Sequence, residues 1–157
     1  MKWLPVLALK LALLMISLGA RAELTIEITQ GMDNPTAIAV VPFAWQGPGS
    51  APTDIASVID GDLNRSGQFL PVSRSDMLGL PSVQSEVYYR DWRAIDTEYL
   101  VIGRVSVAGQ MRIEYELFDV LRQTRVHAGV VTGAVSEARM LAHQVSDAIY
   151  EKLTGIR

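Results

Sequence analysis

Hydrophobic and polar positions in the first half of the chain predict two strands separated by turns. Residues 24–29 alternate apolar and polar side chains, which is the period of a half-buried strand. Residues 36–43 are apolar almost throughout, which suits a strand buried on both faces. Residues 47–52 are rich in Gly and Pro and indicate a turn.

A helix follows this turn. Between Thr53 and Arg65 the apolar residues fall on one helical face, with Pro52 suited to the first turn and Gly67 placed to stop the helix. Residues 69–73 then predict a short returning strand.

The second half of the chain predicts a loop, a short helix and three antiparallel strands. Residues 75–86 are rich in Ser, Pro and Gly, and a short helix is expected over residues 88–95. The first of the three strands covers residues 98–108 and turns at Gly109-Gln110. Alternating apolar residues predict the other two strands. One face of the second strand carries Met111, Ile113, Tyr115 and Leu117, and one face of the third carries Val126, Ala128 and Val130.

The last element is a helix that Ser136 is expected to cap, with Glu137 in its first turn and Gly155 at its end. Its predicted buried stripe is Ala138, Leu141, Ala142, Val145, Ala148, Ile149 and Leu153. A right-handed crossover puts the first long helix on one face of the sheet, and the last helix must cover the same face. The fold class is therefore α/β, a two-layer sandwich with a mixed, mostly antiparallel sheet and two main helices on one face.

The amino terminus has the composition of a secretory signal peptide. Lysines in residues 1–10 precede an apolar run at 11–18 and the small residues of 19–22, so the exported product should begin at Glu23. A charge-free run of eight residues falls far short of the roughly 20 that span a bilayer, so the product is not expected to cross a membrane after cleavage. With no cysteine in the chain, lipid attachment at a cysteine, disulfides and zinc thiolates are excluded.

The net charge also narrows the kinds of partner that the chain can be expected to bind. Of the 157 residues, 14 are basic and 17 acidic, and three of the basic ones lie in the leader. The mature chain would carry 11 basic against 17 acidic residues, a net charge of −6, which does not favour nucleic acid.

Candidate catalytic groups are few. Glu114 and Glu116 lie two apart on a strand, hence on one face roughly 7 Å apart, a spacing open to paired catalytic carboxylates. Arg112 shares that face, and a solvated sheet face is the better interpretation. Asp60 and Asp62 are weaker candidates, because residues two apart on a helix point in different directions.

The remaining chemistry-bearing residues form no expected constellation. His127 and His143 have no second ligand at metal spacing, and Ser50, Ser66 and Ser136 lie outside a nucleophile motif. The glycine-rich passage over residues 43–53 lacks phosphate-binding signatures, and its prolines remove two amide donors. Trp45 and Trp92 could anchor a partner but more often close the end of a core. We expect no catalytic residues, cofactor or metal.

The segment we favour as functional is the mature amino terminus. Leu24, Ile26 and Ile28, tethered through Gly31 and Pro35, can leave or join a sheet, and an unpaired strand can bind another chain by β-augmentation. The alternative is a permanent edge strand, and the residues alone do not separate the two.

Four motifs in order carry a resemblance to a family: Val40–Phe43, Gln46–Ile55, Asp62–Pro71 and Tyr150–Ile156. From Glu23 to its last residue the chain resembles the N-terminal domain of the TolB family of the periplasmic Tol-Pal system. The resemblance implies a two-layer α/β module, which in that family precedes a six-bladed β-propeller that binds Pal. Propeller sequence is missing here, so we expect an isolated domain or a truncated product, and Pal binding is assigned to none of its residues.

The resemblance also implies that the mature amino terminus binds TolA. The expected organisation is a signal peptide over 1–22, a mobile partner-binding segment over 23–35 and the α/β domain over 36–157. Ala37, where many relatives have Pro, and the Asn34-Pro35 turn depart from the family pattern. The TolA-binding residues would be Glu23, Leu24, Thr25, Ile26, Glu27, Ile28, Thr29, Gln30, Gly31, Met32 and Asp33.

The expected function is that of a non-catalytic periplasmic adaptor that supports outer-membrane integrity, constriction during cell division and protein import. Two alternatives stay open. One is a periplasmic hydrolase that uses Glu114 and Glu116, and the other is a structural spacer whose amino-terminal segment is ordered in solution.

Overall fold

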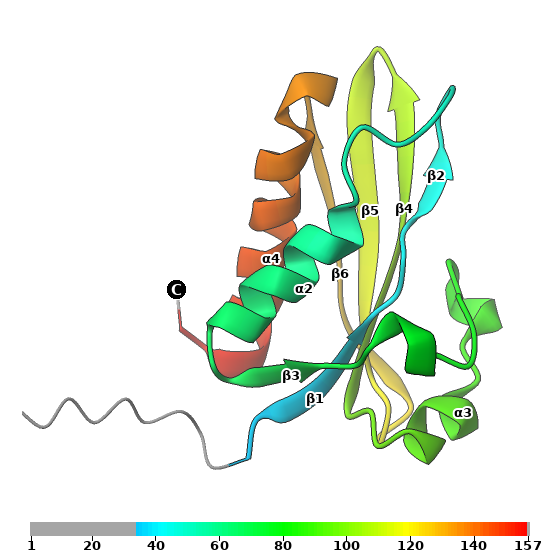
Figure 1. Ribbon diagram of the computed structural model, residues 1–157, viewed down its shortest axis with the longest axis vertical. Coiled ribbons are helices and arrows are strands. Elements are labelled where there is room, and N and C mark those ends of the chain that lie inside the picture. Colours follow the sequence, from blue (N-terminus) through cyan, green and yellow to red (C-terminus); the bar gives the residue numbers. More distant parts are fainter. Residues whose placement is uncertain (1–33, 157) are drawn as a thin grey trace, which may run out of the picture. The chain divides into compact units, whose positions relative to one another are not determined.

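A six-stranded mixed sheet organises residues 34–156, the part of the chain that the computed structural model describes (Figure 1). The predicted leader and the predicted strand at residues 24–29 lie outside these residues. Strand β1 (Thr36–Val40) lies next to the edge of the sheet, parallel to the edge strand β3 (Phe69–Pro71) on one side and to β4 (Tyr99–Ala108) on the other. Ile38 and Val40 pack in one hydrophobic core and Ala39 packs in a second one, so the prediction that this strand is buried on both faces is confirmed.

The rest of the sheet is built around β4. The short strand β2 (Ala44–Gln46) pairs parallel to the second half of β4. Strands β5 (Gln110–Asp119) and β6 (Thr124–Gly133) continue the sheet as an antiparallel meander. The predicted mixed sheet, with its three antiparallel strands at the end, is confirmed.

Two helices, α2 (Ile55–Arg65) and α4 (Ala138–Thr154), cover one face of the sheet (Figure 1). The larger core lies between them and the sheet and includes Ile38, Ile59 and Ile149, all fully buried. The predicted two-layer arrangement with both main helices on one face is therefore confirmed.

A smaller core lies on the opposite face. The short helix α3 (Tyr89–Ala94) and 3₁₀ turns at Arg74–Asp76 and Gln84–Glu86 belong to the segment beside it. Trp92 is only 3% exposed and packs in this core with Leu100 and Phe118, so this ring closes a core.

The start of α2 differs from the prediction. The predicted helix began at Thr53 with Pro52 in its first turn, whereas α2 begins at Ile55 and Asp54 is its N-cap. The Asp54 carboxylate accepts a 3.0 Å hydrogen bond from the Ser57 amide. An acidic cap satisfies an amide that the first helical turn leaves free and interacts favourably with the positive end of the helix dipole. Gly67 has a φ of +71° just beyond the helix, in the region where glycine is favoured, so its predicted role as the stop holds.

The start of α4 also corrects the sequence interpretation. A 3₁₀ turn over Val135–Glu137 precedes the helix, so Ser136 is not its cap. The Glu137 carboxylate instead accepts a 3.1 Å bond from the Ala134 amide. The apolar stripe is confirmed in its main members, and Gly155 ends the helix with a φ of +73°.

The prediction that Val126, Ala128 and Val130 share one face of β6 (Thr124–Gly133) is wrong. A β-bulge at Val126 inserts one extra residue opposite the step from Leu117 to Phe118. Beyond it Val130 pairs with Glu114 on the solvent face and is 47% exposed, whereas Val131 packs on the core. Strict alternation cannot anticipate this, because one inserted residue reverses which face each later side chain points to.

Candidate functional site

The predicted partner-binding residues, 23–33, lie outside the described part of the chain, which begins at their point of attachment. There the Thr36 amide donates to the Gln68 carbonyl at 2.9 Å, and the Glu98 amide donates to the Ala37 carbonyl at 3.0 Å. The Ala37 amide lies 3.3 Å from Glu98 Oε1, a bond that proline at this position could not donate. The segment is therefore joined to a strand that is fixed on both sides from its first residue.

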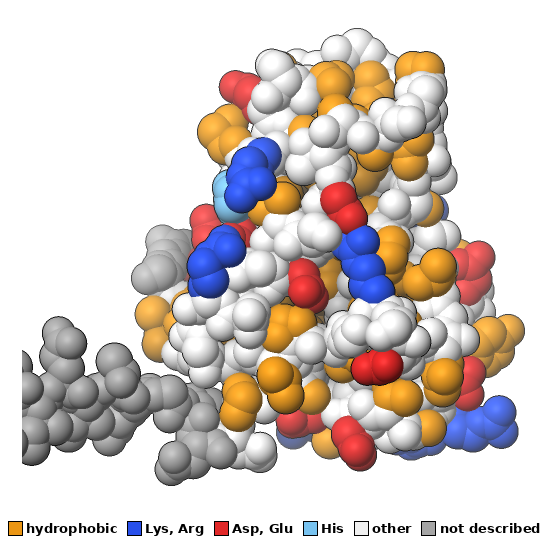
Figure 2. Space-filling view, viewed as in Figure 1, with side chains coloured by type: hydrophobic (Ala, Val, Ile, Leu, Met, Phe, Trp, Pro, Cys, Tyr) orange, Lys and Arg blue, Asp and Glu red, His pale blue; other side chains and the backbone are white. Residues whose placement is uncertain are grey.

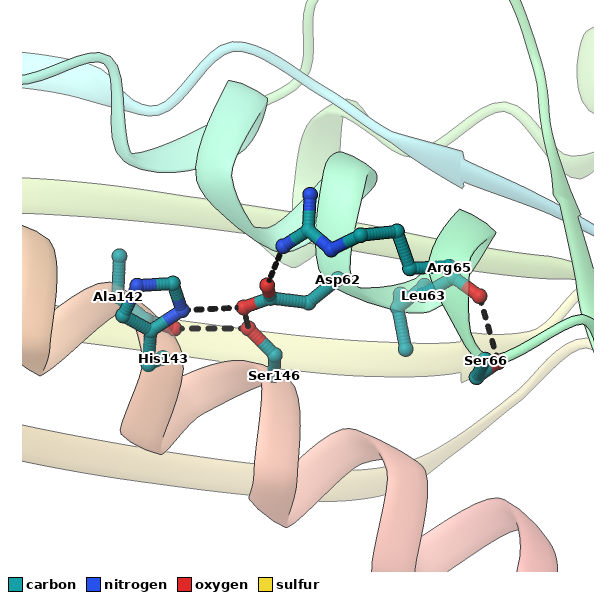
Figure 3. Close-up of polar contacts among 7 residues, drawn as sticks. All are labelled: Asp62, Leu63, Arg65, Ser66, Ala142, His143 and Ser146. Carbon is teal, nitrogen blue, oxygen red and sulfur yellow. Dashed lines mark hydrogen bonds and ion pairs between the residues drawn. The ribbon is translucent and has the colours of Figure 1, made fainter.

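A polar cluster links α2 to α4 on the larger core (Figure 3). Asp62 on α2 accepts hydrogen bonds at Oδ2 from His143 Nδ1 and Ser146 Oγ on α4, both at 2.6 Å, and pairs with Arg65. Burial raises the Asp62 pKa, but the bonds from Ser146 and His143 outweigh it, so the pKa lies below its usual value. An ionised carboxylate only accepts, so the proton lies on His143 Nδ1.

This cluster has three residue types of a hydrolase triad but not its order. A triad needs the serine hydroxyl on the histidine and the histidine on the carboxylate. Here Ser146 and His143 both bind the same oxygen of Asp62, and the second acceptor near Ser146 Oγ is the Ala142 carbonyl at 3.0 Å. The arrangement joins two helices and supports no nucleophilic attack.

Sequence reasoning missed this cluster by setting Asp62 aside. Asp62 is separated from His143 and Ser146 by more than 80 residues, so no local motif connects them. The available signal was a polar residue at the buried position Ser146, within the apolar stripe of α4.

The carboxylates of Glu114 and Glu116 lie on the solvent face of β5, where arginines neutralise them. Glu114 contacts Arg104 at 2.6 Å and Arg112 at 2.8 Å, and Glu116 contacts Arg125 at 2.8 Å. The hydrogen bond from Arg112, then that from Arg104, lowers the Glu114 pKa. A general acid needs a raised pKa, so Glu114 is tuned away from that role.

The amino end of α2 does not resemble an anion site either. Arg74 makes two bonds to the Asp54 carboxylate, at 2.7 and 2.9 Å. These bonds to Arg74 are the main reason why the Asp54 pKa falls to about 2. A fixed carboxylate therefore occupies the helix end to which a phosphate would bind.

The other candidates have structural surroundings. His127 Nε2 lies 3.3 Å from the Tyr115 hydroxyl, and Ser66 Oγ donates to the Leu63 carbonyl at 2.6 Å. Trp45 packs against the larger core and donates its indole N–H to the Gly49 carbonyl. Within residues 34–156, no group of three His, Asp or Glu side chains is placed to hold a metal ion. None of the helices in that range has the length and apolarity to cross a bilayer.

Comparison with known proteins gives the relatives. The family described as the TolB amino-terminal domain matches residues 24–126. The chain is 41% identical over 144 residues to the Tol-Pal system protein TolB of Pseudomonas fluorescens SBW25, and 46% identical over 143 residues to that of Marinomonas sp. MWYL1. These alignments cover 91% and 88% of this chain and 33% of each relative, so the chain spans about a third of their length.

Comparison with solved structures points to the same family. TolB from Acinetobacter baumannii superposes with a TM-score of 0.65 at 30% identity, covering 79% of this chain and 29% of that one. The LpoB C-terminal domain from Salmonella enterica gives a TM-score of 0.53 at 17% identity, covering 67% and 87%, which shows a shared fold only. The chain therefore belongs to the TolB amino-terminal domain family.

Proposed function

We propose that this domain acts in the Tol-Pal system of the bacterial envelope as a non-catalytic adaptor that binds TolA through residues 23–33. The observation that carries the proposal is the family match, which begins at residue 24 and so includes nearly all of this segment. Relatives with this domain are named Tol-Pal system protein TolB. The leader-like amino terminus supports a periplasmic location.

In the proposed mechanism Leu24, Ile26 and Ile28 add to TolA as an extended strand. The backbone would supply the affinity and the alternating aliphatic side chains the selectivity. Ordering an extended segment costs free energy, so the expected dissociation constant is about micromolar. The adaptor would thereby support outer-membrane integrity, constriction during division and protein import.

Charge and geometry favour this over the hydrolase alternative. The one carboxylate pair that the sequence offered for acid and base chemistry is held in ion pairs with arginines. The Asp62 cluster lacks the order of a triad. Both groups are accounted for by structural roles.

The test is isothermal titration calorimetry of TolA against the chain and a variant lacking residues 23–34. We expect the deletion to abolish measurable binding, whereas the double variant Glu114→Gln with Glu116→Gln should bind like the parent. Undiminished affinity after the deletion would overturn the proposal.

A pair of point variants tests the strand mechanism within the segment. Ile26→Asp puts a charge on the aliphatic face, and Thr25→Asp puts the same charge on the other face. If the aliphatic face contacts TolA, the first should weaken binding at least about tenfold and the second by much less. Equal effects would contradict insertion as a strand with one buried face.

A further inference from the structure

A groove on the far side of the domain from α2 and α4 belongs to none of the features above. It is a hollow of about 430 Å³ between the loop at residues 78–81 and helix α3. Its apolar walls come from Leu78, Leu80, Pro81, Tyr88 and Trp92. We call it the α3 groove.

The rim of the α3 groove is apolar and open to solvent. Leu78, Leu80 and Tyr88 are 62%, 65% and 69% exposed, the largest exposed fractions among the large hydrophobic side chains of residues 34–156 apart from Leu121 at 63%. Scattered exposed leucines are ordinary, but three such side chains around one hollow mark a contact surface.

Contacts within the domain hold the residues around the groove in place. Trp92 is buried in the smaller core, and its carbonyl accepts bonds from the Ile95 and Thr97 amides. The Glu86 carboxylate accepts a 2.8 Å bond from the Ser82 amide, which closes the loop beside it. A ligand would therefore lose little of its binding free energy to ordering the groove.

Acidic side chains give the lining of the α3 groove a negative charge. Glu86 and Asp91 line it, and none of the described residues that line it is Lys or Arg. The backbone bond from Ser82 lowers the Glu86 pKa, so this carboxylate is charged at neutral pH. The nearest cation to Asp91 is Arg90, 3.6 Å away on a side chain that is 90% exposed. At the lower right, where Figure 1 places the segment leading into α3, Figure 2 shows hydrophobic and acidic side chains with basic side chains beside them.

Charge also selects among possible occupants. The chain's own segment 23–33 contains Glu23, Glu27 and Asp33 and no basic residue, so it would meet the groove with the same sign. The chain as a whole carries a net charge of −3, which gives a second copy no general electrostatic attraction to this site.

We propose that the α3 groove binds an extended segment of another protein that carries an aliphatic side chain next to a Lys or Arg. The aliphatic side chain packs between Leu78, Leu80 and Tyr88, and the cation lies beside Glu86 and Asp91. This site is separate from the TolA-binding segment, so the two proposals stand or fall independently.

The experiment is an NMR titration of the ¹⁵N-labelled chain with the peptide acetyl-Lys-Leu-Lys-Leu-Lys-amide. The matched probe is acetyl-Glu-Leu-Glu-Leu-Glu-amide. We expect the basic peptide to shift the amides of residues 78–92 and the Trp92 indole N–H, and the acidic peptide to leave them in place. The affinity should fall as salt rises from about 0.05 to 0.5 M, because the contributing charges lie at the surface.

Variants separate the apolar and electrostatic contributions. Leu80→Ala should weaken binding about tenfold, since it removes most of one apolar wall. Asp91→Asn should weaken it about twofold to fivefold and reduce its salt dependence. Leu121→Ala is the matched control, because Leu121 is equally exposed but lines a different hollow, and it should bind like the parent.

Four results would each overturn the proposal. They are no shift at millimolar basic peptide, equal binding of the acidic peptide, equal losses in Leu80→Ala and Leu121→Ala, and shifts at residues 78–92 that depend on protein concentration without peptide. The last result would identify a second copy as the occupant. Leu80 is exposed, so its replacement should leave the fold intact, and the unshifted amides of β4 and β5 check this.

Discussion

Replacing Asp62 by Ala should weaken the attachment of α2 to α4. The variant removes the common acceptor of His143, Ser146 and Arg65. Ala also has a better helix propensity than Asp, by about 0.5 kcal/mol, which would partly mask the loss. Asp147→Ala is the matched control, because Asp147 is an exposed residue inside α4 and gains the same propensity.

The magnitude follows from the exposure of each partner. The bond from Ser146, which is 2% exposed, dominates, and a hydrogen bond to a charged acceptor contributes about 1.5 to 3 kcal/mol. Ser146 can still donate to the Ala142 carbonyl, which moves the estimate toward the lower end of that range. The side chains of His143 and Arg65 are 40% and 65% exposed, so their bonds add less than about 1 kcal/mol. We expect a loss of about 2 kcal/mol relative to the control.

The loss should also depend on pH. The folded-state pKa of Asp62 lies below the ordinary value of 3.8. Its contribution to stability is therefore present in full above pH 3.8 and disappears as the pH falls through the lower, folded-state pKa. The difference between parent and variant should shrink on acidification.

Urea denaturation followed by circular dichroism measures these quantities. The free energy of unfolding is compared for the parent, Asp62→Ala and Asp147→Ala at neutral pH and at about pH 3. Equal free energies for the two variants at neutral pH would refute the claim that this cluster holds the helices together.

Two further predictions concern stability. A methyl group at Gly103 would overlap the ring of Phe43, so Gly103→Ala should cost about 1 to 3 kcal/mol by thermal unfolding, whereas Gly79→Ala, with no atom within 4 Å, should be nearly neutral. Asp54→Ala should cost about 1 kcal/mol through the lost cap, and this contribution should vanish as the pH falls from 3.8 toward 2. Asp54→Ser keeps a cap but not the ion pair with Arg74, so it should restore most of the stability without the pH dependence; a drop equal to that of Asp54→Ala would contradict the capping role.

The order of elements could be predicted from the sequence because each element's burial is periodic. The apolar run that became β1 and the stripe of α4 are read directly from local spacing. The bulge at Val126 could not be predicted, because it depends on how one residue fits between two strands, which periodicity does not encode. The cap at Asp54 is a local contact with Ser57, and an Asp directly before the first apolar residue of α2 was the available signal for it.

The candidate sites also differ in how far the sequence could predict them. The resemblance supplied residues 23–33, which stay a prediction because they lie outside the described residues. The Asp62 cluster joins residues more than 80 positions apart. The α3 groove lies between a segment predicted as a loop and the predicted short helix after it, and Leu78, Leu80 and Tyr88 follow no common period. Only the folded chain brings these groups together.

The place of β1 in the sheet has a mechanical consequence. The proposed TolA-binding segment continues directly into this strand, whose two neighbours both run parallel to it. Tension applied at residue 34 along the strand would load the hydrogen bonds to β3 and β4 in shear, so that several must break together and not one after another. Resistance to such pulling is set by the rate of unfolding under load. A domain tethered in this way can transmit force from its amino terminus to its main core without first unravelling.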